Sequence, residues 1–177
     1  EYEEQIRARY GAYADDYLAL FNVKTADDLA RLNADRKRVE PLLTPRTWAM
    51  AETRPERDRK PMHVYHFNRQ MPGDDAGAFH SSELWYVFGT LDRCWRSLVP
   101  GFVPEDYQLS RRMTDYWTNF AKTGDPNGPT VPEWPAFTAK TPAAMVLNER
   151  ETAPHDFADD KILDGLVKLQ LKQALGE

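Results

Sequence analysis

The chain is organised around one stretch, Gly77-Ala78-Phe79-His80-Ser81-Ser82-Glu83-Leu84-Trp85-Tyr86-Val87-Phe88-Gly89. It opens on small residues, places His80 three residues before a carboxylate, and continues as an apolar run that has to be buried. A histidine has an unperturbed pKa of about 6.5, so it can take and return a proton near neutral pH when a carboxylate and a nucleophile lie within reach. The stretch therefore predicts a general base, His80, presented on a loop by a buried anchor.

The composition of the 177 residues is that of a globular protein, with 41% hydrophobic and 12% aromatic residues. The formal net charge is −5 and basic residues alternate with acidic ones, so nucleic acid is not expected as a partner. No apolar run approaches the ~20 residues that cross a bilayer, so a membrane is not expected as a partner either. Cys94 is the one cysteine, which rules out an intrachain disulfide and favours a reducing compartment, the cytoplasm over secretion.

The first residues, Glu1-Tyr2-Glu3-Glu4-Gln5, lack the basic and apolar pattern of a signal peptide. They have the pattern of a helix interior and are not preceded by an initiator methionine. We therefore expect the chain to be a piece of a longer protein.

Residues 1–60 predict a series of short helices. The first, 1–10, stops at Gly11, and a second follows with apolar residues on one face. Thr25 is the expected N-cap of a third helix that ends at Pro41, because Asp28 stands three residues later. Thr44 is the expected N-cap of a fourth helix over 45–52.

Residues 62–68 form the strongest strand pattern, short and rich in aromatic and β-branched residues. His63 and His66 suggest a metal pair, but residues three apart on a strand point to opposite faces and cannot close on one ion. No metal site and no cofactor are expected.

The second half predicts two further helices and one strand. The clearest is a helix over 105–123 that ends at Gly124, with an apolar face that includes Tyr116, Trp117 and Phe120. Residues 145–147 predict a short edge strand, and residues 156–175 predict a closing helix.

The chain contains a candidate base but no recognisable nucleophile. None of its four serines, Ser81, Ser82, Ser97 and Ser110, stands in the Gly-x-Ser-x-Gly pattern of a nucleophile elbow. Cys94 has no partner pattern and is expected to be a buried thiol. Glu83 either orients His80 or holds its turn, and we expect a supporting role of this kind because the two residues are near neighbours.

Three segments, in this order, resemble the type-B carboxylesterases, the α/β-hydrolase family that includes para-nitrobenzyl esterases and, more distantly, cholinesterases. Residues 64–67 resemble the strand before the family's histidine, and residues 77–89 resemble the histidine segment itself. Residues 109–127, followed by Trp134-Pro135, resemble the family's downstream helix and turn.

The resemblance implies the C-terminal, helix-rich part of an α/β-hydrolase fold, with one or two sheet strands. Residues 1–177 would be the C-terminal part of a carboxylesterase domain. Within it, 1–60 would be a helical segment, 61–137 would hold the strand, the histidine loop and a helix, and 138–177 would hold an edge strand and the closing helix. The lack of a cysteine in 156–177 resembles bacterial members more than extracellular animal ones.

The resemblance also implies a role for each site residue. His80 would be the histidine of a Ser-Glu/Asp-His triad that hydrolyses small-molecule esters. The serine and the acid would lie in the upstream part of the same enzyme, which is then the expected partner. Trp85 would line a substrate pocket, although core packing explains it equally well. The alternative function is a non-catalytic fragment or binding module that packs with a partner polypeptide.

Overall fold

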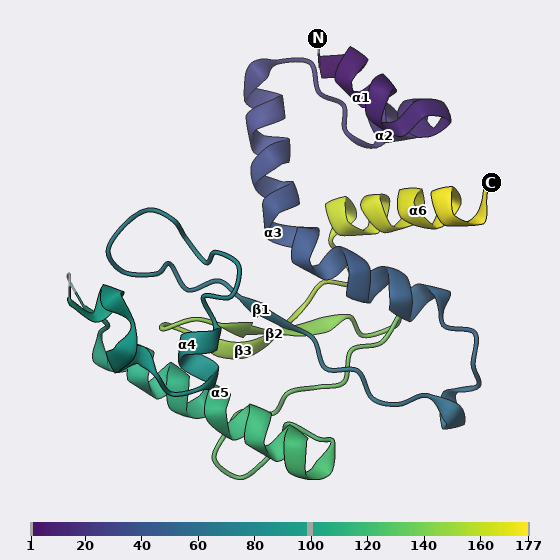
Figure 1. Cartoon of the computed structure of the whole chain (residues 1–177). Coiled ribbons are helices and arrows are strands. Elements are labelled where there is room, and N and C mark those ends of the chain that lie inside the picture. The colour runs from purple at the N-terminus through teal and green to yellow at the C-terminus, as the bar shows by residue number, and fades with distance from the viewer. Residues whose placement is uncertain (1, 99–100, 177) are drawn as a thin grey trace. The chain divides into compact units, whose positions relative to one another are not determined.

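The computed structural model describes residues 2–98 and 101–176, with the side chains of 35–38 and 98 left out. It divides into two compact units. The helical unit comprises Glu1–Lys60, Thr138–Pro142 and Phe157–Glu177, and the sheet unit comprises Pro61–Phe137 and Ala143–Asp156. Figure 1 shows the elements of both units.

The helical unit consists of helices that share a core of large apolar side chains. Its elements are α1 (Tyr2–Tyr10), η1 (Gly11–Tyr13), α2 (Ala14–Leu20), α3 (Ala26–Ala51), η2 (Glu56–Asp58) and α6 (Lys161–Leu175). Helices α3 and α6 pack against each other, and Val39 and Leu42 of α3 and Val167 of α6 are fully buried. Tyr17 of α2 is fully buried as well and stacks on Tyr10 at a centroid distance of 4.4 Å.

Helix α3 begins as the sequence predicts but does not stop where it predicts. Thr25 Oγ1 accepts a hydrogen bond from Asp28 N at 3.1 Å, and Asp28 Oδ2 accepts one from Thr25 N at 2.9 Å, which confirms the N-cap. The helix then continues through Pro41 and Pro45, so the predicted stop at Pro41 and the predicted new cap at Thr44 are wrong. Each proline removes one backbone hydrogen bond, but the apolar face that α3 buries on α6 keeps the chain helical.

The sheet unit places helices beside a three-stranded sheet (Figure 1). Its elements are β1 (Tyr65–Phe67), α4 (Leu84–Val87), η3 (Leu91–Arg93), η4 (Trp95–Leu98), α5 (Pro104–Thr123), β2 (Ala143–Leu147) and β3 (Thr152–Asp156). The order is β1-β2-β3, with β1 parallel to β2 and β3 antiparallel to it. Tyr65 pairs with Met145 and Leu147 with Thr152. The core lies between the sheet and helices α4 and α5 and includes Met71, Tyr86, Leu91, Leu109, Met113, Tyr116, Trp134, Met145 and Leu147.

The predicted edge strand over 145–147 is in fact the central strand of the described sheet, because β2 pairs on both sides. Its second partner, β3, was not predicted: the segment is polar and contains Pro154, features that argue against a strand. Since β3 extends to Asp156, the closing helix begins only at Lys161, where Asp160 caps it.

Helix α5 confirms the strongest helix prediction. It ends at Gly124, whose φ of +80° is the left-handed conformation that terminates helices, and Leu109, Met113 and Tyr116 are buried. Phe120, predicted on the buried face, is 49% exposed. None of the helices that the structure describes is long and apolar enough to cross a bilayer.

Candidate active site

His80 lies exposed on a turn that directly precedes helix α4. Two backbone hydrogen bonds close the turn, from Ser82 N to Phe79 O at 3.0 Å and from Leu84 N to Ser81 O at 3.2 Å. Ser81 has a φ of +69°, and no other non-glycine residue in the described part of the chain has a positive φ. A residue with a side chain adopts this conformation only where its surroundings impose it, so the turn beside His80 is held in one shape.

The apolar run after His80 is buried only in part. In helix α4, Tyr86 and Val87 are buried, whereas Leu84 and the following Phe88 are 43% and 70% exposed. The predicted buried anchor is therefore one side of a single helical turn. Its opposite side remains uncovered in the described chain.

The loop before His80 is fixed by Arg96. The guanidinium donates two hydrogen bonds of 2.8 Å to the carboxylate of Asp74 and a third, also of 2.8 Å, to Pro72 O. Its central carbon also lies over the rings of Phe79 and Trp95, 5.1 Å and 4.7 Å from their centroids. These contacts tie Phe79, the residue before His80, to η4.

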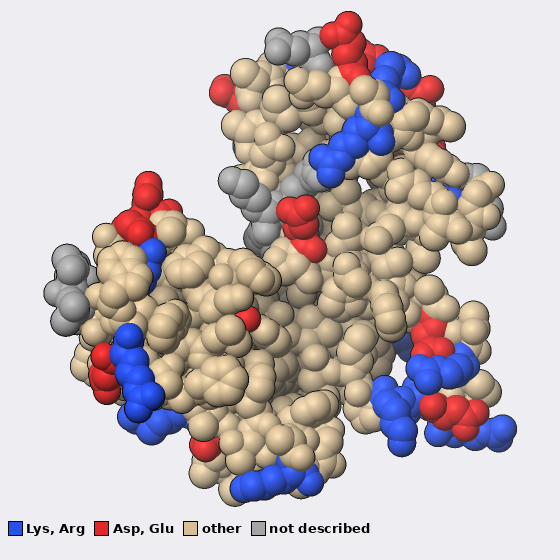
Figure 2. Space-filling view, in the orientation of Figure 1, with Lys and Arg blue, Asp and Glu red and all other residues tan. Residues whose placement is uncertain are grey.

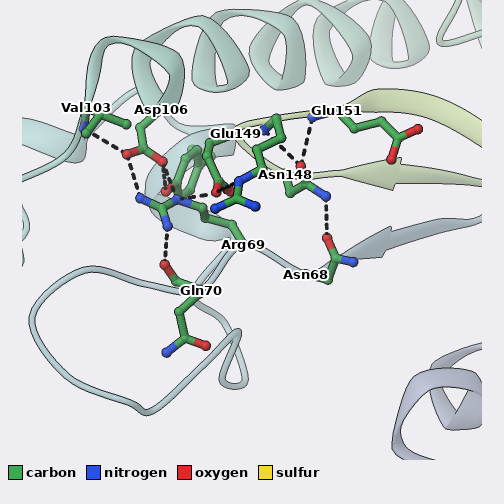
Figure 3. A network of polar contacts seen from close by, with 10 residues as sticks. Asn68, Arg69, Gln70, Val103, Asp106, Asn148, Glu149 and Glu151 are labelled. Atoms are coloured by element: carbon green, nitrogen blue, oxygen red, sulfur yellow. Dashed lines mark hydrogen bonds and ion pairs between the residues drawn. The ribbon is translucent and has the colours of Figure 1, made fainter. Parts of the chain in front are cut away.

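The helix after His80 is fixed by a buried carboxylate, Asp106, in the first turn of α5. Asp106 is fully buried and accepts four hydrogen bonds. Arg69 donates two, from Nε at 2.6 Å and Nη2 at 2.9 Å, Tyr86 OH donates one at 2.7 Å, and Val103 N donates one at 2.9 Å. Figure 3 shows Arg69 reaching from the end of β1 to this carboxylate. One carboxylate thus joins the end of β1, the start of α5 and helix α4.

The pKa values in this cluster follow from burial and pairing. Burial by itself raises the pKa of Asp106, but the hydrogen bonds from Arg69, Tyr86 and Val103 outweigh it, so the net pKa is lowered. Burial, followed by the bond to Asp106, raises the pKa of the Tyr86 hydroxyl. Asp106 is therefore the charged acceptor and Tyr86 the neutral donor of their hydrogen bond.

The same cluster reaches the turn between β2 and β3. Arg69 Nε lies 3.4 Å from Glu149 Oε2, and Asn148 Nδ2 donates to Asn68 Oδ1 at 2.8 Å (Figure 3). Asn148 Oδ1 accepts the N–H groups of Arg150 and Glu151, which closes the turn.

The three residues predicted for the site lie on one short segment. Glu83 is the N-cap residue of α4, its carbonyl accepts the N–H of Tyr86 and of Val87, and its charge raises the pKa of Tyr65 further after burial has already raised it. Within the described residues, no hydrogen bond or ion pair joins His80 to Glu83. Trp85 is half-buried and packs against the core of the sheet unit. The roles of His80, Glu83 and Trp85 stay predictions.

Cys94 and Ser110 are both buried in the sheet unit. Cys94 is buried, as predicted. Ser110 Oγ donates to Tyr86 O at 2.8 Å. The described residues contain no group of three His, Cys, Asp or Glu side chains that could hold a metal ion. On the visible face, Figure 2 shows basic side chains in small groups, most of them beside acidic ones.

Sequence reasoning missed the residues that fix the turn, namely Arg69, Arg96 and Asp106. Asp106 offered one signal, because an acid in the first turn after Pro104 is a typical helix start. Arg69 and Arg96 offered none. Their partners, Asp106 and Asp74, are 37 and 22 residues away in the sequence.

Comparison with known proteins links this segment to esterases. The model of the Carboxylesterase family matches residues 4–163. Carboxylesterase 5A of Felis catus is 42% identical over 85 residues, which cover 44% of this chain and 16% of that protein. The para-nitrobenzyl esterase of Bacillus subtilis (strain 168) is 37% identical over 84 residues, which cover 48% of this chain and 17% of that protein. The chain thus spans only about a sixth of these relatives.

Solved structures show the same likeness over nearly the whole chain. A thermophilic PNB esterase matches with a TM-score of 0.60 and 23% identity, covering 93% of this chain and 32% of the other. A carboxylesterase of Geobacillus stearothermophilus matches with a TM-score of 0.59 and 25% identity, covering 92% and 34%. The predicted fold class, part of an α/β-hydrolase fold, is confirmed.

Proposed function

The chain belongs to the Carboxylesterase family, and on this basis we propose that His80 transfers the protons in the hydrolysis of carboxylic esters by a Ser-Glu/Asp-His triad. The serine and the acid of that triad would come from an upstream part of the same enzyme. One observation carries the proposal: within the segment matched by the family, His80 is an exposed imidazole on a turn held from both sides.

In the proposed reaction, His80 takes the proton of the serine hydroxyl as its oxygen attacks the ester carbonyl. The protonated imidazole then gives this proton to the leaving alcohol, and an acyl-enzyme forms. In the second half, His80 takes a proton from water, whose oxygen attacks the acyl carbon, and returns it to the serine oxygen. His80 acts twice in each turnover, so its position has to be reproducible.

Glu83 and Trp85 have supporting roles in this proposal. Glu83 occupies the N-cap position of α4, and its carbonyl oxygen accepts the N–H groups of Tyr86 and Val87, so it supports the turn that carries His80. Trp85 offers a half-buried ring on the same segment, suited to contact with an ester's acyl or alcohol group.

The exposed apolar side chains around His80 support the idea that further polypeptide covers this face. Trp95 is 60% exposed, Phe88 is 70% exposed and Leu84 is 43% exposed. An uncovered group of this kind is typical of a surface that binds protein. The same observation favours the alternative, a non-catalytic module that packs with a partner polypeptide.

Hydrolysis of para-nitrophenyl acetate separates the two proposals. We expect turnover, abolished by a serine-reactive organophosphate, from a polypeptide that contains both this chain and the upstream part. The 177-residue chain alone should be inactive and should regain activity when the upstream part is added. If the longer polypeptide folds but shows no organophosphate-sensitive turnover, the esterase proposal is wrong and the module is favoured.

A further inference from the structure

Helix α4 cannot hold its own position. It is a single turn, Leu84–Val87, and a helix of this length is unstable without tertiary contacts. The turn that carries His80 leads directly into it. The contacts that place α4 therefore also place the imidazole of His80.

The polar contacts of α4 come mainly from one side of α5. Tyr86 OH donates to Asp106 at 2.7 Å, and Ser110 Oγ donates to Tyr86 O at 2.8 Å. Thr114 Oγ1 lies within hydrogen-bond distance of Val87 O, at 3.1 Å, and of Ser110 O, at 2.9 Å. The three α5 residues are four apart, so they follow one face of the helix. Residues on successive turns of α5 thus bind both a side chain and backbone carbonyl groups of α4.

The side chain of Asp106, which binds Tyr86 of α4, is held in one orientation. Its four hydrogen bonds occupy both carboxylate oxygens, and it is fully buried, so its side chain cannot turn without breaking a charge pair with Arg69. Tyr86 is fully buried as well, and its ring packs at 5.1 Å from Phe67 of β1. The Tyr86–Asp106 hydrogen bond and the packing of Tyr86 on Phe67 together fix the position of α4 relative to both the sheet and α5.

We propose that Asp106 and Tyr86 are positioning residues for His80, which act by holding α4 and the turn before it in register with α5. This inference rests on the proposed function of His80. Within the described residues, no hydrogen bond or ion pair joins either residue to His80, and neither moves a proton in the proposed reaction.

The test compares two buried tyrosines whose hydroxyl groups donate to different acceptors. Tyr86→Phe removes the hydroxyl bonded to Asp106. Tyr116→Phe removes a hydroxyl that donates to Pro132 O, also at 2.7 Å, from a ring that is equally buried in the same core. Both variants lose one hydrogen bond of a buried tyrosine, but we expect only the first to loosen α4.

The first readout is hydrogen exchange of the backbone amides of 80–88 by mass spectrometry, on the 177-residue chain or on a longer polypeptide that contains it. We expect Tyr86→Phe to speed exchange in this segment about tenfold more than Tyr116→Phe does. Equal exchange in the two variants would overturn the proposal. If Tyr86→Phe does not fold, Ser110→Ala replaces it, and unchanged exchange of 80–88 in that variant has the same meaning.

The second readout is ester turnover by the polypeptide that includes the upstream part. Tyr86→Phe should lower kcat about tenfold with KM changed less than twofold, because it loosens the base without altering substrate binding, and Tyr116→Phe should leave kcat unchanged. Faster exchange without a fall in kcat would overturn the positioning role. Absence of turnover in the unmutated polypeptide would instead overturn the proposed function, and the exchange result would still show whether Tyr86 holds α4.

Discussion

His80 combines exposure with a restrained backbone, which is what a residue that transfers protons twice per turnover requires. The side chain is free of hydrogen bonds within the described chain, so both ring nitrogens are available to a serine and an acid. The segments before and after His80 are each held by a tertiary contact. Phe79 lies against Arg96, and Tyr86 is bonded to Asp106.

His80→Ala should remove nearly all ester turnover in a polypeptide with a complete triad, on the order of 10⁴-fold, without unfolding the protein. The control is His155→Ala, because His155 is also an exposed histidine of the sheet unit but lies on β3. Turnover is measured with para-nitrophenyl acetate and folding by circular dichroism. Comparable loss in both variants, or near-normal turnover in His80→Ala, would contradict the role proposed for His80.

Ser81 tests whether the turn is strained. Because its φ is +69°, Ser81→Gly should change the free energy of unfolding by less than about 1 kcal/mol, since glycine adopts this conformation readily. Ser81→Val should cost about 1–3 kcal/mol, since a β-branched residue does not. Urea denaturation of both variants checks the difference. Equal stability of the two would mean that Ser81 is not held at positive φ in solution.

At the scale of elements, α3 shows how packing overrides local signals. Two prolines and a threonine in a capping context predict two helices, yet one helix of 26 residues forms. Val39 and Leu42, near the first proline, are fully buried. Burial of this face offsets the backbone hydrogen bonds that the prolines remove.

Substitutions at Thr25 and Thr44 test whether α3 is one continuous helix or two helices with separate N-caps. Thr25→Ala should cost about 1 kcal/mol of stability, because it removes the acceptor for Asp28 N. Thr44→Ala should be neutral or stabilise by up to about 0.5 kcal/mol, because Thr44 lies exposed inside α3, where alanine is the better helix former. Thermal or urea unfolding followed by circular dichroism checks both. A similar loss in the two variants would restore the prediction of a second cap at Thr44.

At the scale of the whole molecule, paired carboxylates occur in both units. In the helical unit, hydrogen bonds from Thr25, Lys24 and Arg31 lower the pKa of Asp28 to about 2. In the sheet unit, the hydrogen bonds from Arg96 lower the pKa of Asp74, and the bonds described above lower that of Asp106. Each carboxyl binds its proton more weakly in the folded state than in the unfolded state.

The stability of both units should therefore be full at neutral pH and fall as the pH drops below about 4, where the unfolded chain takes up protons first. Asp106→Asn should have a much lower free energy of unfolding than the unmutated chain at pH 7. This difference in free energy should be smaller at pH 3, where the unmutated chain loses the stabilisation that its ionised Asp106 provides. Glu105→Gln serves as the control and should show no such decrease, because it changes an exposed carboxylate of the same helix that has no hydrogen bond or ion pair within the described residues. Urea denaturation followed by tryptophan fluorescence reports mainly on the sheet unit, which holds Trp85, Trp95, Trp117 and Trp134. A constant difference across the pH range for Asp106→Asn would contradict the lowered pKa of Asp106.

The sequence by itself determined the features that depend on neighbouring residues. The cap at Thr25, the end of α5 at Gly124, the buried face of α5 and the candidate base on a short turn all follow from spacings of a few residues. Resemblance in three ordered segments also determined the family and the fold class, both of which the comparisons confirm.

Only the tertiary structure decided which distant residues meet. It joined Arg69 to Asp106, Arg96 to Asp74, and Pro154 of β3 to Met145 of β2. No local pattern marks such pairs, because a buried charge or an irregular strand becomes favourable only once its partner is in place. Two of these pairs, Arg69–Asp106 and Arg96–Asp74, fix the segments on either side of His80. For this reason the sequence could point to the histidine but not to the residues that hold it.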